Sequence, residues 1–186
     1  MDIVVSRAVD LVDEAGLDEL SLARVSDDLG VQASALYNHV DGLDGLVQAV
    51  VSRASDNLAD TLRDSAVGRS GLTALDAVAV AYRAFARDHP GQYGATLLPT
   101  GTSLDTAAAP QATIVDILAR ILESYGLAGD GAVHAARIVR SAIHGFVTLE
   151  ASEAFIHPQD TDESFAELLE FIARGLEPPA PDQMTA

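Results

Sequence analysis

Apolar residues recur along most of this chain at intervals of three and four, the spacing that places them on one face of an α-helix. Alternation of apolar and polar residues, which would indicate half-buried strands, is absent from the sequence. The pattern predicts helices over about residues 4–15, 22–29, 33–39, 43–62, 75–88, 114–125, 131–155 and 161–176, with a short one between 91 and 110. We therefore expect an all-α fold of about nine helices, the short ones first.

Residues suited to helix ends support these boundaries. Glycines follow the first two predicted helices at Gly16 and Gly30, where a left-handed backbone would end each helix. Short polar residues precede four helices and are the predicted N-caps, namely Ser21, Asp41, Asp130 and Thr161. The fourth helix carries one apolar stripe that starts at Leu43 and continues to Leu62.

Composition narrows the class of protein. The 186 residues are 48% hydrophobic and 21% charged, which indicates a globular chain with a core of its own. Cysteine is absent, which excludes disulfides and thiolate metal sites. No apolar run approaches the roughly 18 residues of a spanning helix, and no basic flank of a secretory signal precedes the first helix. We therefore expect a cytoplasmic protein.

The sequence offers no catalytic or metal-binding constellation. Five histidines are scattered without a closely spaced pair, at His39, His89, His134, His144 and His157. No glycine-rich phosphate loop and no nucleophile with a neighbouring base are indicated by spacing. We predict no metal, no cofactor and no enzymatic activity.

Three short helices followed by a long one, with a glycine turn between the second and third, are typical of a helix-turn-helix unit. The turn is Leu29-Gly30-Val31. The predicted third helix then presents side chains that are small or polar, namely Ala33, Ser34, Ala35, Tyr37, Asn38 and His39. Such side chains can enter a major groove and carry hydrogen-bond donors and acceptors.

The amino-acid sequence around this turn, over about residues 4–50, resembles the DNA-binding domain of TetR-type transcriptional repressors. The strings that carry the resemblance are Ser21-Leu22-Ala23-Arg24-Val25, Leu29-Gly30-Val31 and Leu36-Tyr37-Asn38-His39-Val40. Two later strings resemble the His-Pro-Gly and Trp-His-Gly elements of one C-terminal variety of that family. They are His89-Pro90-Gly91 and Ile143-His144-Gly145-Phe146, in which Ile143 replaces the tryptophan.

The resemblance implies a homodimer that binds a palindromic DNA operator and is released by a small-molecule effector. It implies a DNA-binding domain over residues 1–45 and a ligand-binding and dimerisation domain over 46–177. Separately, Glu177-Pro178-Pro179 ends the last predicted helix, so we expect a disordered tail over 178–186. We expect dimerisation through the apolar helices at about 131–155 and 161–176, packed as a four-helix bundle with interface residues such as Phe165, Leu168 and Leu169.

The resemblance also implies roles for single residues in DNA binding. Tyr37 would donate a hydrogen bond to a phosphate, although its ring could instead pack on the first helix. Base edges or backbone would be faced by Ala33, Ser34, Asn38 and His39. His39 could alternatively cap carbonyl groups at a helix end. Ser21 or Leu22 would lie at a phosphate contact of the second helix.

Candidate ligand contacts lie in the C-terminal part. His144 would be a polar contact in an apolar cavity, with Thr148 one turn further on the same face. The alternative is a hydrogen-bonded core histidine beside Gly145. Tyr82 and Tyr93 are further candidates, and the favoured alternative is that they are core or rim aromatics.

Charge argues against the DNA-binding interpretation. The chain has a formal net charge of −17 and no lysine, and residues 1–45 contain ten acidic side chains against two arginines. Leu43 stands where the family usually has a phosphate-binding lysine, and the usual basic arm before the first helix is missing. However, Val31 to Val40 contains no acid. The alternative function is therefore a helical ligand-binding or protein-interaction module that has lost DNA binding.

Overall fold

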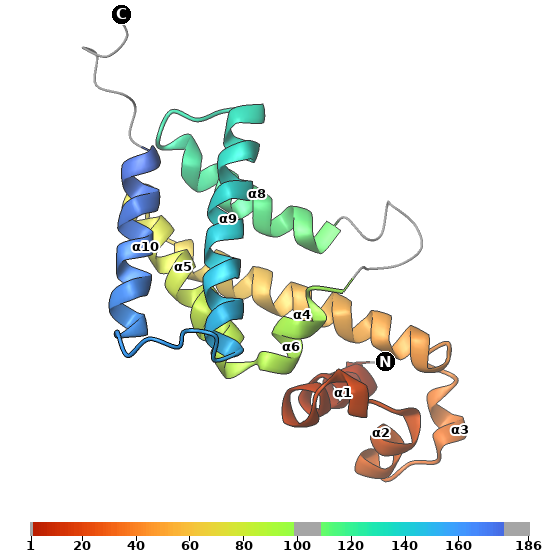
Figure 1. Ribbon diagram of the computed structural model, residues 1–186. Coiled ribbons are helices and arrows are strands. Elements are labelled where there is room, and N and C mark those ends of the chain that lie inside the picture. The colour runs from red at the N-terminus through yellow and green to blue at the C-terminus, as the bar shows by residue number, and fades with distance from the viewer. Residues whose placement is uncertain (1, 99–108, 177–186) are drawn as a thin grey trace, which may run out of the picture. The chain divides into compact units, whose positions relative to one another are not determined.

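The computed structural model describes residues 2–98 and 109–176, and throughout these ranges the regular elements are helices (Figure 1). Nine α-helices and one 3-10 helix lie in the described residues, which confirms the predicted all-α class. No helix in the described ranges is long and apolar enough to cross a membrane. The predicted tail at 178–186 lies outside the described residues, as does most of the predicted loop between Gly91 and Pro110.

The described residues form two compact units, one made of residues 2–61, 84–98 and 109–113, and the other of residues 62–83 and 114–176. The first unit contains α1 (Asp2–Ala15), the 3-10 helix η1 (Leu17–Glu19), α2 (Leu22–Leu29), α3 (Ala33–Leu36) and α6 (Pro90–Ala95). It also contains most of α4 (Gly42–Ala66) and the end of α5 (Gly71–Asp88). Its core is one apolar cluster drawn mainly from α1 and α4.

The predicted helix ends of this unit are largely confirmed. Gly16 and Gly30 adopt positive φ angles of 86° and 65°, and the Ser21 hydroxyl oxygen accepts a hydrogen bond from the Arg24 N–H at 3.2 Å. The third helix was expected to reach His39, but α3 ends at Leu36. Beyond it the chain tightens, because the His39 N–H bonds back to the Leu36 carbonyl, three residues earlier.

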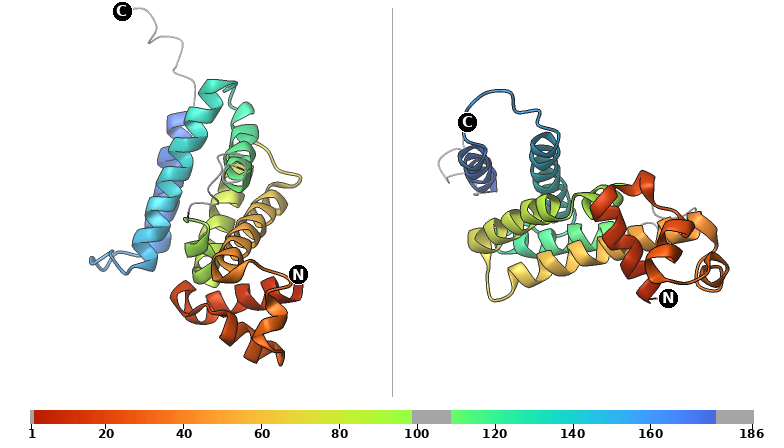
Figure 2. Two further views of the ribbon diagram at one scale, coloured as in Figure 1. Left: turned by 90° about the vertical axis from the view of Figure 1, so that its right-hand side faces the viewer. Right: turned by 90° about the horizontal axis from the view of Figure 1, so that it is seen from below.

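The second unit contains α8 (Ala109–Glu123), α9 (Asp130–Ala151) and α10 (Thr161–Leu176), with the end of α4 and the start of α5. Helices α9 and α10 lie side by side and antiparallel (Figures 1 and 2). Arg83 fastens them to α5: its Nε donates to Glu150 at 2.8 Å and its Nη2 lies 2.8 Å from Asp162. The guanidinium also covers the rings of Phe146 and Phe165.

Helix α4 ends four residues later than expected, α5 begins four residues earlier and α8 five residues earlier, and three boundaries of α9 and α10 also differ from the expectation. Asp130 is the first residue of α9, and Gly129 with φ 56° occupies the cap position. The helix ends at Ala151 instead of Phe155, and Glu153 follows with a left-handed φ of 53°. Asp160, one residue before Thr161, caps α10, because its carboxylate accepts the N–H groups of Asp162 and Glu163 at 2.7 and 3.2 Å.

Candidate DNA-binding site

The turn between α2 and α3 is closed by two backbone hydrogen bonds. The Gly30 N–H donates to the Asp27 carbonyl at 3.1 Å, and the Val31 N–H donates to the Ser26 carbonyl at 3.0 Å. This pair of bonds around a left-handed glycine is the Schellman arrangement, which satisfies the last carbonyls of α2. The glycine therefore sets the direction in which the chain leaves α2 and enters α3.

The segment after this turn is exposed apart from two buried anchors and the half-buried Ala35. Leu36 and Val40 are buried in the apolar cluster, whereas Tyr37 retains 62% of its surface. The remaining predicted DNA contacts of this segment are all exposed, namely Ala33, Ser34, Asn38 and His39. Thus the structure places five predicted residues together on an accessible segment whose backbone is fixed from beneath.

The two predicted contacts on α2 have different surroundings. Ser21 is half-buried, and its hydroxyl oxygen already accepts the Arg24 N–H, which leaves the hydroxyl hydrogen available to donate. The Leu22 side chain packs against the apolar cluster. Leu22 can therefore reach a phosphate only through its backbone N–H, which lies in the first turn where no earlier helical carbonyl is available.

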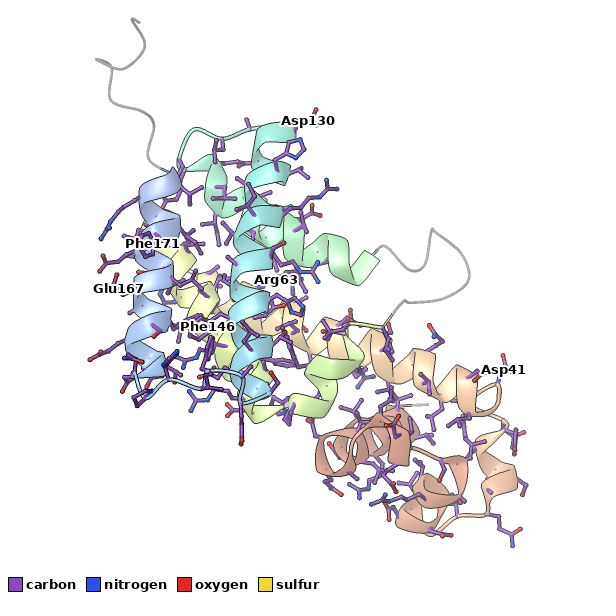
Figure 3. The ribbon with its side chains drawn as sticks, in the orientation of Figure 1. Asp41, Arg63, Asp130, Phe146, Glu167 and Phe171 are labelled. Atoms are coloured by element: carbon purple, nitrogen blue, oxygen red, sulfur yellow. The ribbon has the colours of Figure 1, made fainter. Side chains whose placement is uncertain are left out.

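The start of α4 is also accessible. Asp41 precedes the helix (Figure 3), and Leu43 is 43% exposed. Leu43 was expected to begin the buried stripe of this helix, but the first fully buried residue is Leu46. A side chain at position 43 can therefore be changed without opening the apolar cluster.

Arg7 is held against the surface of the protein by two carboxylates. Its guanidinium donates hydrogen bonds of 2.8 Å to two carboxylates. One is that of Glu14 in α1, and the other is that of Asp28 near the end of α2. These hydrogen bonds raise the pKa of Arg7, and the Glu14 pKa is lowered chiefly by the bond to Arg7. Arg7 thereby joins α1 to α2.

A second polar cluster joins α1 to α6. The Asp13 carboxylate accepts the Gln92 N–H at 2.8 Å and the Gln92 side-chain amide at 2.6 Å, and it lies 2.9 Å from the His89 ring. A Cβ atom at Gly91 would lie only 2.0 Å from the Val12 carbonyl oxygen. Glycine at this position lets the backbones of α6 and α1 touch.

This cluster explains the His-Pro-Gly string in physical terms. His89 contacts Asp13, Pro90 occupies the first position of α6, where its missing N–H costs nothing, and Gly91 provides the close approach. The sequence contains the His-Pro-Gly string, but it gave no indication that Asp13 is the residue the string contacts. Asp13 and Gln92, 79 residues apart, carried no signal that they would meet.

The four predicted ligand contacts are divided between the two units. Tyr93 is buried in the first unit, and Tyr82 is buried in the second. His144 is half-buried on α9, and its pKa is lowered, first by burial and then by the charge of Arg140. Thr148, one turn further, is exposed.

An apolar groove that the sequence did not predict lies along α9 and α10. It has a volume of about 650 Å³, and its walls include Tyr125, Leu127, Ile138, Phe171 and Ile172. Ile138 and Phe171 are 69% and 65% exposed, and Phe171 projects from α10 (Figure 3). None of the four predicted ligand contacts lines this groove.

Phe165 and Leu169, which were expected at the dimer interface, belong to the core of the second unit. They retain 4% and 8% of their surface, and Phe165 packs on Phe146 with ring centroids 5.1 Å apart.

The described residues contain no group of three or more acidic, histidine or cysteine side chains placed to hold a metal ion.

Comparisons with known proteins agree with this architecture. A family model described as tetracyclin repressor-like, C-terminal domain, matches residues 75–172. The chain is 36% identical over 176 residues to the uncharacterized HTH-type transcriptional regulator Rv0681 of Mycobacterium tuberculosis, covering 94% of this chain and 80% of that protein. It is 34% identical over 174 residues to the uncharacterized HTH-type regulator YobS of Bacillus subtilis, covering 93% and 90%.

Solved structures show the same fold. A TetR transcriptional regulator from Streptomyces coelicolor superimposes with a TM-score of 0.74 at 18% identity, covering 94% of this chain and 96% of that one. A TetR variant from Acinetobacter baumannii, in complex with minocycline, gives a TM-score of 0.66 at 24% identity and covers 92% and 93%.

Proposed function

The chain belongs to the tetracyclin-repressor-like family of helix-turn-helix transcriptional regulators, and from this premise we propose that it is a cytoplasmic, ligand-responsive repressor. It binds a palindromic operator as a homodimer through residues 1–45. The observation that carries this proposal is the exposed segment from Ala33 to His39, anchored by buried Leu36 after the left-handed turn at Gly30. That arrangement leaves polar groups facing outward on a fixed backbone, as base reading requires.

Within this segment the roles follow from chemistry and exposure. Tyr37 donates its hydroxyl to a phosphate, which positions the domain on the duplex. Ser34, Asn38 and His39 offer donors and acceptors to base edges, and Ala33 gives an apolar contact to a thymine methyl. The Ser21 hydroxyl and the backbone N–H of Leu22 contact a second phosphate.

The dimer forms through the exposed apolar face of α9 and α10, defined here by Ile138, Leu149 and Phe171. Ile138 and Phe171 line the same apolar groove, and large exposed apolar side chains that gather on one face mark an interaction site. A second copy related by a twofold axis covers the same face, which gives a four-helix bundle.

The effector binds within residues 46–177, and Tyr82, Tyr93, His144 and Thr148 remain our candidate contacts. The minocycline complex of the Acinetobacter protein supports a small-molecule effector. We further propose that this part belongs to the Trp-His-Gly variety, on the support of the string Ile143-His144-Gly145-Phe146, in which Ile143 replaces the tryptophan. The cluster of Asp13, His89 and Gln92 transmits a displacement of α6 directly to α1.

A second candidate function follows from the charge. Residues 1–45 carry ten acids and two arginines, and both arginines are paired with acids within the protein. Nonspecific attraction to DNA is therefore weak. A module that binds a ligand or a protein partner and no longer binds DNA would show the same surface.

Selection of duplexes from a random pool by the ligand-free protein separates the two. We expect enrichment of an inverted repeat whose half-site centres lie about 10 base pairs apart, or a multiple of that spacing. The matched control is the Ser34→Ala/Tyr37→Phe/His39→Ala variant, which should enrich nothing. Enrichment of nothing by either protein would favour the second function. Equal enrichment by both proteins would exclude the second function and move DNA reading away from these three residues.

A further inference from the structure

The two arginines of residues 1–45 are held very differently. Arg7 bonds to two carboxylates and joins two helices, and only 26% of its side chain is exposed. Arg24 makes a single contact, from Nη1 to Glu19 Oε2 at 3.2 Å, with the two side chains 41% and 65% exposed. Exposed single contacts of this kind contribute little stability, so the Arg24 pair exchanges readily with another anion.

Arg24 also stands where helix electrostatics disfavour it. It is the third residue of α2, in the first turn, where the helix dipole favours acids and opposes cations. Glu19, at the end of η1, and Glu14, whose pKa Arg24 helps to lower, supply the compensating negative charge. A residue that opposes local helix preference is often retained for function.

We propose that Arg24 is the phosphate-binding cation of the DNA-binding domain. In the free protein the Glu19 carboxylate is paired with the Arg24 guanidinium. On binding, a phosphate oxygen replaces the Glu19 carboxylate on the guanidinium. Glu19 thus lowers the affinity for DNA by competing for the same donor. This inference rests on the proposed DNA-binding function.

The exchange has two consequences for the chemistry of binding. Phosphate is a better partner than a single exposed carboxylate, because the guanidinium can donate two parallel hydrogen bonds to its oxygens. Each phosphate that Arg24 neutralises releases counterions, so this contact steepens the slope of log affinity against log salt by about 0.9 per subunit. Arg7 contributes none, since it remains on Glu14 and Asp28.

The test is a double-mutant cycle on the full-length protein. Affinity is measured for the duplex that the wild type selects from a random pool, at several potassium chloride concentrations. Glu19→Gln should tighten binding several-fold. Arg24→Gln should weaken it about tenfold and reduce the slope by about 0.9 per subunit. In the Arg24→Gln background, Glu19→Gln should have no further effect, because the competition has been removed.

Two controls define the outcomes. Asp10→Asn removes one exposed acid of α1 and should leave affinity and slope unchanged. Arg24→Lys keeps the charge and should preserve the slope. If Glu19→Gln tightens binding equally in both backgrounds, Glu19 only repels DNA, and the exchange is overturned. If the wild type binds DNA and Arg24→Gln leaves the slope unchanged, the Arg24 assignment fails while the proposed function stands. A wild type that selects no duplex overturns both.

Discussion

Gly91 is the position at which the fold most clearly leaves no room for a side chain. A Cβ atom there would overlap the Val12 carbonyl, whereas one at Gly94, in the same helix, would meet nothing within 4 Å. We predict that Gly91→Ala lowers the free energy of unfolding by about 1–3 kcal/mol, the usual cost of overpacking. Gly94→Ala should be neutral or slightly stabilising, because alanine favours the helix. Urea unfolding of both variants checks this, and equal stability of the two would contradict the direct packing of α6 on α1.

Tyr37 carries the prediction for phosphate contact. The residue is 62% exposed, so its packing on the first helix is at most partial. Tyr37→Phe should leave the melting temperature nearly unchanged. It should weaken binding to a selected duplex by about tenfold or more, since hydrogen bonds to charged groups contribute about 1.5–3 kcal/mol. Fluorescence anisotropy measures the affinity, and an unchanged dissociation constant would exclude this role for the hydroxyl.

Residues that act through near neighbours were predictable from the sequence, whereas those that act across the fold were not. Ser21 was predicted to cap the start of α2 and Gly30 to end it, and both of these predictions are confirmed. Both roles are set by local backbone geometry. Asp13 meets Gln92 only because α1 and α6 pack together, and no periodicity records that contact. Leu43 follows the stripe of its helix, yet α4 begins before the core does, so the side chain is accessible.

At the scale of elements, the start of α4 gives a prediction about DNA affinity. Because Leu43 is 43% exposed and Leu46 is fully buried, Leu43→Lys should cost little stability, whereas Leu46→Lys should unfold the domain. Next to DNA, the added lysine should tighten binding to specific and nonspecific duplexes by similar factors. The salt slope should steepen by about 0.9 per subunit. A lower melting temperature with an unchanged slope would place this residue away from the phosphate backbone.

Helix existence was easier to predict than helix ends. Long apolar stripes predicted α4, α5, α8, α9 and α10, because burial of one face decides whether a helix forms. The cap of α10 is Asp160 because its carboxylate reaches two N–H groups, and the next residue, Thr161, was an equally plausible choice from sequence. The chain leaves α9 through Glu153, which has a left-handed backbone conformation. A glutamate side chain does not favour this conformation, so the sequence did not predict it.

For the whole molecule, the proposed dimer face separates interface residues from core residues. Phe171 is 65% exposed, whereas Phe165 is buried against Phe146. Phe171→Asp should therefore give a folded monomer that no longer binds a two-half-site duplex with high affinity, since the half-sites require one fixed spacing. Ile156→Asp, at an 87% exposed position in the loop before α10, is the matched control and should remain dimeric. Analytical ultracentrifugation distinguishes the two, and a dimeric Phe171→Asp would move the interface elsewhere.

The most direct test of the central claim is the ratio of affinities for a selected and a scrambled duplex. Specific binding is typically about a thousandfold or more tighter than nonspecific binding. In the Ser34→Ala/Asn38→Ala/His39→Ala variant, all three changes are at exposed positions, so the melting temperature should match that of the wild type. Our account predicts that the ratio falls to near one while nonspecific affinity is retained. A ratio that survives this substitution would contradict DNA reading by the segment after Gly30.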